Sequence, residues 1–79
     1  MTNYSVIEKA AREVLKYQDK HYQTSMTWDE AYKLVQNWYD HTDLTSPYLL
    51  SACVLAFGDY TPVTFSQIMD ASRQFEKWL

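Results

Sequence analysis

The sequence is poor in the residues that build tight turns and cross-links. Its 79 residues include one glycine, two prolines and one cysteine. The tight loops of β-hairpins favour glycine. The scarcity of turn residues in this chain therefore argues against an all-β fold. A single cysteine excludes a disulfide within the chain, which fits a reducing interior. One glycine also excludes the glycine-rich loops that bind phosphates and dinucleotides.

Long apolar runs and excess positive charge are lacking as well. No stretch approaches the roughly 20 apolar residues of a membrane span, and Met1–Ser5 lack the basic start of a signal peptide. Seven Lys and Arg stand against ten Asp and Glu, which gives a net charge of −3. This balance disfavours non-specific attraction to nucleic acid or anionic lipid. We therefore expect a soluble, cytoplasmic protein without membrane contact.

What the sequence does contain is a set of helix-start signals. Three times a Ser or Thr is followed three residues later by Glu or Gln, an arrangement in which each side chain can bond the other's backbone amide. These pairs are Ser5–Glu8, Thr27–Glu30 and Thr64–Gln67. A fourth start, Ser46-Pro47, places proline at the first helical position, where its missing N–H costs nothing. We predict one all-α domain, 1–79, with four short helices at about 6–20, 28–40, 47–57 and 65–77.

The third predicted helix differs from the others in having no charge. From Leu44 to Gly58 the sequence holds no Asp, Glu, Lys or Arg, and apolar side chains surround the helix axis. A helix that is apolar all round is normally buried on all sides. Helix 47–57 is therefore predicted to be the most buried, and two interpretations stay open. It is the central helix of the domain, or one of its faces meets a second molecule.

Residue patterns that carry chemistry are not found. No histidine or cysteine pair has the spacing of a zinc site, and Asp40-His41-Thr42-Asp43 lacks the glycine and terminal glutamate of a calcium loop. Cys53 lies in the most apolar helix, where a thiol more often packs than reacts. Most carboxylates are expected in solvent or at helix starts, where burial would not raise their pKa. We predict no catalytic residue, metal or cofactor, and do not expect an enzyme.

Aromatic residues make up 16% of the chain, which is high. Tyr and Trp are enriched at protein interfaces because they bury much area at low entropic cost. The other interpretation is that a small core uses large side chains at its rim. For a binding surface, the predicted residues are Tyr32, Tyr39, Leu50, Leu55, Tyr60, Trp78, Asp40 and Asp43.

These observations favour a small acidic protein that acts by binding another protein. Accessory proteins of bacteria and their phages, such as immunity proteins, antitoxins and inhibitors of host defence, are built on this scale, a likeness of size and class only. An acidic binder would present carboxylates to a basic groove of its partner, in mimicry of nucleic acid, and salt would weaken the complex. The candidate carboxylates are those of Asp29, Glu30, Asp40 and Asp43.

Two alternative functions follow from other features. A homodimer would form if helix 47–57 completed its burial against a second copy. A helix-turn-helix DNA-binding regulator is suggested by the outline of residues 49–75, with Arg73 and Lys77 as contacts. The acidic neighbours Asp70 and Glu76, and a connector over 58–64 that is longer than the usual turn, make nucleic acid the less favoured partner.

Overall fold

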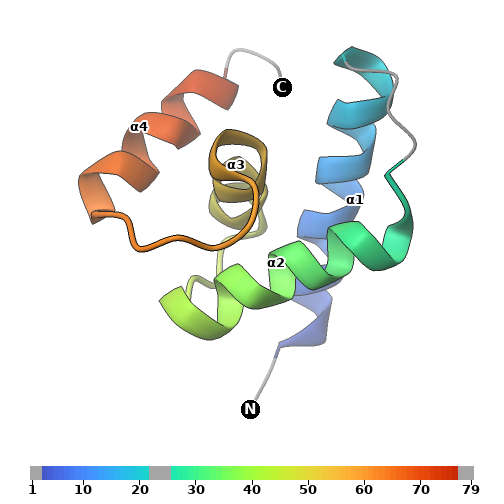
Figure 1. Ribbon diagram of the computed structural model, residues 1–79, viewed down its shortest axis with the longest axis horizontal. Coiled ribbons are helices and arrows are strands. Elements are labelled where there is room, and N and C mark those ends of the chain that lie inside the picture. Colours follow the sequence, from blue (N-terminus) through green and yellow to red (C-terminus); the bar gives the residue numbers. More distant parts are fainter. Residues whose placement is uncertain (1–2, 22–25, 77–79) are drawn as a thin grey trace.

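The computed structural model describes residues 3–21 and 26–76, and within these ranges the protein consists of four helices and no strand (Figure 1). The helices are α1 (Tyr4–His21), α2 (Trp28–Thr42), α3 (Pro47–Phe57) and α4 (Phe65–Glu76). The prediction of a small all-α domain is confirmed. The bounds of α3 agree with it, whereas α1 begins at Tyr4 instead of Val6 and α2 ends at Thr42 instead of Asp40.

Helix α3 lies at the centre of the fold. It packs against α1, α2 and α4, as Figure 1 shows, and its residues Leu50–Val54 form an unbroken buried run. Most of the apolar surface of α3 is thus covered within one chain, while Leu55 and Phe57 are half-buried and Ala56 is exposed. The prediction that this helix is the most buried is confirmed, and its central position agrees with the first of the two interpretations.

The core is built mainly from the faces that α1 and α2 turn toward α3. Its fully or almost fully buried side chains are Ile7, Ala10, Ala11, Val14, Ala31, Val35, Trp38, Leu50, Cys53, Val54 and Ile68. Ile68 is the one member of this cluster from α4, which approaches α3 closely and meets α1 through the edge-on ring contact of Tyr17 with Phe75, at 5.2 Å. Helix α4 is therefore the helix least enclosed by the fold.

Three of the four predicted helix starts have the expected bond to the Ser or Thr hydroxyl, and one of them has the full reciprocal pair. At α4 the bonds are reciprocal: the Thr64 amide donates to Gln67 Oε1 at 2.8 Å, and the Gln67 amide donates to Thr64 Oγ1 at 3.2 Å. At α2 the Thr27 hydroxyl accepts from the Glu30 amide, and at α3 the Ser46 hydroxyl accepts from the Leu49 amide. These caps satisfy donors that a helix start otherwise leaves bare.

The predicted cap of α1 is wrong. Ser5 lies inside the helix, and Asn3 takes the capping position, with its Oδ1 accepting from the Val6 amide at 3.3 Å. Asparagine caps a helix about as well as serine. The earlier start also lets the Asn3 amide donate to the Tyr39 hydroxyl of α2 at 3.1 Å. This contact between helices, which local pattern does not reveal, favours the longer helix.

Two residues in the left-handed region end α2 and α3. Gly58, at φ 77°, stops α3, and its amide donates to the Val54 carbonyl at 2.8 Å. Asp43, at φ 57°, ends α2, and its amide donates to the Tyr39 carbonyl at 2.9 Å. Aspartate is among the few residues with a side chain that tolerate this conformation. Predicted as a binding residue, Asp43 has a structural role at the end of α2.

The position of the α1 cap can be tested by two single substitutions. Asn3→Ala removes the capping oxygen and is expected to lower the free energy of unfolding by about 1 kcal/mol. Ser5→Ala leaves the cap intact and is expected to change it by less than about 0.5 kcal/mol. Urea unfolding followed by circular dichroism measures both. A larger loss in Ser5→Ala than in Asn3→Ala would place the helix start at Ser5.

Candidate protein-binding surface

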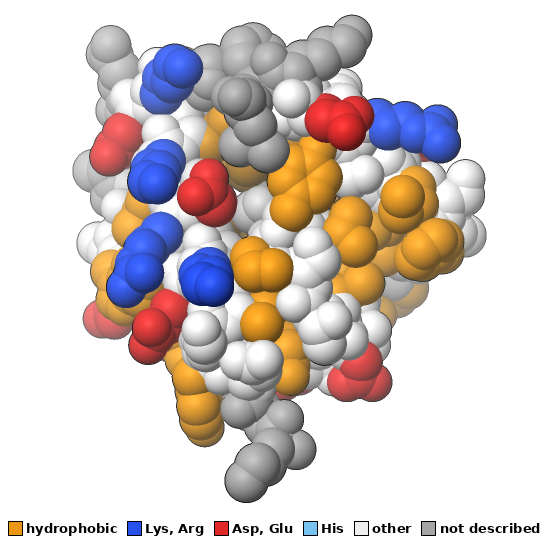
Figure 2. All heavy atoms as spheres, turned by 180° about the vertical axis from the view of Figure 1, so that it is seen from behind, with side chains coloured by type: hydrophobic (Ala, Val, Ile, Leu, Met, Phe, Trp, Pro, Cys, Tyr) orange, Lys and Arg blue, Asp and Glu red, His pale blue; other side chains and the backbone are white. Residues whose placement is uncertain are grey.

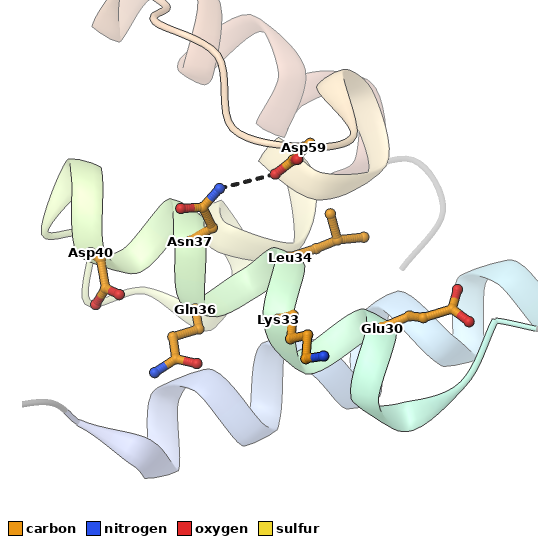
Figure 3. Close-up of a pocket in the computed structure, with 7 residues that line it drawn as sticks. All are labelled: Glu30, Lys33, Leu34, Gln36, Asn37, Asp40 and Asp59. Atoms are coloured by element: carbon orange, nitrogen blue, oxygen red, sulfur yellow. Dashed lines mark hydrogen bonds between the residues drawn. The ribbon is translucent and has the colours of Figure 1, made fainter.

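A shallow hollow of about 520 Å³ lies on the surface beside α2 (Figure 3). Its lining comes from α2 and from the connector between α3 and α4, and consists of Glu30, Lys33, Leu34, Gln36, Asn37, Asp40 and Asp59. Three of these side chains carry a carboxylate and one carries an ammonium group. The half-buried Leu34 adds an apolar surface. The hollow is thus an acidic depression with an apolar part, hereafter the α2 hollow.

The connector residue Asp59 is held in place by two hydrogen bonds to one of its oxygens. Asn37 Nδ2 donates to Asp59 Oδ1 at 3.0 Å, as Figure 3 shows, and the Tyr60 amide donates to the same oxygen at 2.8 Å. Both bonds favour the ionised form, and together they lower the pKa of Asp59, the Asn37 bond most. The carboxylate is therefore fixed, and it is charged at neutral pH.

A cluster of aromatic rings, the Trp38 cluster, fixes the connector to α2. Trp38 is fully buried and its Nε1–H donates to the Gly58 carbonyl at 2.9 Å. The ring of Tyr60 meets Trp38 edge-on at 5.0 Å, and His41 stacks on Tyr60 at 4.1 Å. His41 Nδ1 lies 2.8 Å from the Asn37 carbonyl, which only accepts, so this nitrogen carries the hydrogen. The Trp38 cluster thereby holds Asp59 beside Asn37.

The structure gathers only some of the residues predicted to bind a partner. Asp40 lines the α2 hollow, and Tyr60 belongs to the neighbouring Trp38 cluster. Tyr32 and Tyr39 lie half-buried on the flank of α2 that meets α1, where Tyr39 bonds the Asn3 amide. Trp78 lies outside the described residues.

The two leucines predicted for the binding surface lie at different depths in α3. Leu50 is 0% exposed and belongs to the core, so its side chain has no surface to offer in this fold. Leu55 is half-buried and packs against the core. The central position of α3 explains this difference, since most of its circumference is covered by the other helices.

Of the four carboxylates proposed to face a basic groove, the structure places two at the same surface. Glu30 and Asp40 line the α2 hollow, whereas Asp29 and Asp43 do not. Asp59 and Asn37 were missed by sequence reasoning, because no local pattern shows that the segment after α3 returns to α2. The one available signal is Gly58, which ends α3 immediately before Asp59 and forces the chain to turn there.

The opposite face has charges of both signs. Figure 2 shows Lys and Arg side chains along the side formed by α1, Asp and Glu between them, and hydrophobic side chains across the middle. Lys16 and Glu13 of α1 approach to 3.6 Å, a solvent-exposed pair of small energetic value. The more one-sided charge of the α2 hollow sets that surface apart.

Within residues 3–21 and 26–76, no group of three or more His, Cys, Asp or Glu is placed to hold a metal ion. No helix of the described chain is both long and apolar enough to cross a membrane. Burial raises the pKa of the Cys53 thiol to about 11, so this thiol is protonated at neutral pH and is a poor nucleophile.

Comparison of the chain with protein-family models, curated proteins and solved structures found no match. The assignment of a function therefore depends on the geometry and charge of the molecule itself.

The Trp38 cluster predicts that the two tryptophans of α2 contribute very different amounts to the free energy of unfolding. Trp38→Phe removes the bond to the Gly58 carbonyl and leaves a cavity, and is expected to lower the free energy of unfolding by about 2–4 kcal/mol. Trp28→Phe is the control, because Trp28 is 40% exposed, and should change it by less than about 0.5 kcal/mol. Denaturant titration of both variants measures the difference. Equal losses would contradict the role given to the Trp38 cluster.

The raised pKa of Cys53 predicts slow thiol chemistry. In the folded protein, modification by a disulfide reagent at pH 8 is expected to be much slower than in urea, where the thiol is exposed. The raised pKa, about 11 against the ordinary 9.0, also predicts that stability falls as the pH rises from about 9 toward 11, because the unfolded chain then releases the proton first. Equal reaction rates with and without urea would show that Cys53 is accessible.

Proposed function

We propose that this protein acts by binding a basic surface of a partner protein, with the α2 hollow as its docking surface. The observation that carries the proposal is that three carboxylates, Glu30, Asp40 and Asp59, line one depression with a single opposing charge from Lys33. Two of these residues come from α2, and the fold adds the third from the connector (Figure 3).

The chemistry of the α2 hollow suits the long cationic side chains of a partner. Arginine and lysine carry an apolar stem and a charged head, and the stem can pack on Leu34 while the head meets a carboxylate. The fixed Asp59 carboxylate supports this use, because it loses little freedom when it pairs. Such a binding mode suits an accessory, inhibitor or immunity-type protein that occupies a basic groove of its target.

The two alternative functions have less support. The outer side of α4, which a DNA-binding reading would place in the groove, pairs Arg73 with Asp70 at 3.7 Å, so its one described basic side chain faces an acid. The homodimer hypothesis depends on the apolar side chains that surround helix 47–57. The contacts of α3 with all three other helices account for that feature within one chain.

The proposed function is tested with charge-neutral variants of the α2 hollow. The double variant Glu30→Gln/Asp40→Asn is compared with Asp19→Asn/Glu76→Gln, which removes one Glu and one Asp charge from exposed positions outside the hollow. The probe is a peptide of alternating arginine and alanine, with binding measured by calorimetry at increasing salt. We expect the first variant to bind about tenfold more weakly, since two exposed ion pairs contribute up to about 1 kcal/mol each.

The control variant has the same net charge and should bind like the unmodified protein once long-range attraction is screened by salt. Equal weakening in both double variants would attribute binding to net charge alone and would overturn the α2 hollow as the docking surface. Absence of any binding to the arginine peptide at low salt would overturn the proposed function. Duplex DNA, tested in parallel, would favour the regulator hypothesis if it bound instead.

A further inference from the structure

Exposed aromatic rings gather where the start of α1 meets α2. Among the described residues, the exposed large hydrophobic side chains are Tyr4, Trp28 and Phe65, at 59%, 40% and 67%. The ring of Trp28 contacts that of Tyr32 on α2, and Tyr4 lies within electrostatic range of Tyr32, whereas Phe65 lies at the start of α4. The group Tyr4, Trp28 and Tyr32, together with Glu8 of α1, is called the aromatic strip below.

The geometry of the aromatic strip is set by contacts within and between the two helices. The rings of Trp28 and Tyr32, one turn apart on α2, have centroids 6.0 Å apart and planes inclined by 47°. The bond from the Asn3 amide to the Tyr39 hydroxyl anchors the start of α1 beside α2. The aromatic faces are thus held at the surface by two packed helices.

Glu8 gives this strip a negative charge. Partial burial is the main cause that raises the pKa of Tyr32, and the negative charge of Glu8, then that of Tyr4, raises it further, so both lie within electrostatic range of this ring. Glu8 forms no ion pair among the described residues, although Arg12 follows one turn later on α1. The exposed Glu8 carboxylate, near the half-buried Tyr32, is therefore available to an incoming group.

We propose that the aromatic strip binds an arginine side chain of the partner protein. Ring faces carry negative charge and attract a cation placed within about 6 Å, and tryptophan does so best. A guanidinium group can lie flat on a ring while its N–H groups donate to a carboxylate, so it can stack on the Trp28–Tyr32 pair and donate to the Glu8 carboxylate near Tyr32. The inference rests on the proposed function, and it identifies the anchoring residue of the basic partner.

The strip is tested with two variants and a matched control. Trp28→Leu keeps an apolar side chain but removes the ring, and Glu8→Gln removes the charge at an exposed position. Phe65→Leu is the control, because Phe65 begins α4 as Trp28 begins α2, is more exposed, and has no ring contact among the described residues. The probes are the arginine–alanine peptide and the same peptide with citrulline, the neutral isostere, at every arginine.

We expect Trp28→Leu and Glu8→Gln each to weaken binding of the arginine peptide about three- to tenfold. Phe65→Leu should leave binding unchanged. The indole N–H resonance of Trp28 should shift with the arginine peptide and not with the citrulline peptide. An unmoved Trp28 resonance, or equal weakening in Trp28→Leu and Phe65→Leu, would overturn the inference.

This failure is distinguishable from failure of the proposed function. If Glu30→Gln/Asp40→Asn loses the arginine peptide while Trp28→Leu binds it normally, the α2 hollow stands and the aromatic strip is rejected. If the reverse is found, the aromatic strip stands and the α2 hollow is rejected.

Discussion

The burial of α3 is the constraint on which the arrangement of the other helices depends. A helix with no charged residue and apolar side chains on every side is stable in water only if neighbours cover most of its circumference. In a chain of this size the cover has to come from all three remaining helices, and α1, α2 and α4 each pack on α3. The apolar faces of these three helices are therefore turned inward, and their polar faces form most of the molecular surface.

Polar groups near α3 are accommodated without breaking this burial. The hydroxyls of Ser51 and Ser72 each donate to a carbonyl three residues earlier in their own helix. The Tyr48 hydroxyl donates to the Ser72 carbonyl and so links α3 to α4. No buried side-chain nitrogen or oxygen of the described residues is left without a partner. Because unpaired buried groups are costly, this pairing allows a small core to remain stable.

The positions of the helices could be predicted because their signals are local. The Thr64–Gln67 box, the Ser46-Pro47 start and the Gly58 stop each depend on residues within one turn, and the structure has all three. The errors came from contacts between distant segments. Asn3 caps α1 where Ser5 was expected, and the Asn3 bond to Tyr39 spans two helices. No periodicity contains that information.

The candidate site was predictable to a smaller extent for the same reason. Asp40 was predicted and lines the α2 hollow, and Glu30 was named as part of an acidic surface. Leu50 was predicted from the apolarity of its helix, but a wheel that is apolar all round does not show which side lies deepest. Asp59 and Asn37 became part of the site only because Trp38 and Tyr60 fix the connector against α2.

Buried and exposed aromatic residues have different roles in this fold. Trp38 is fully buried, holds the Gly58 carbonyl and determines where the connector lies, whereas Trp28 on the same helix leaves a large part of its ring in water. A small domain gains stability from the first kind of ring and nothing comparable from the second. We propose that Trp28, an exposed tryptophan held near Tyr32, serves recognition of a cationic partner and not the needs of the core.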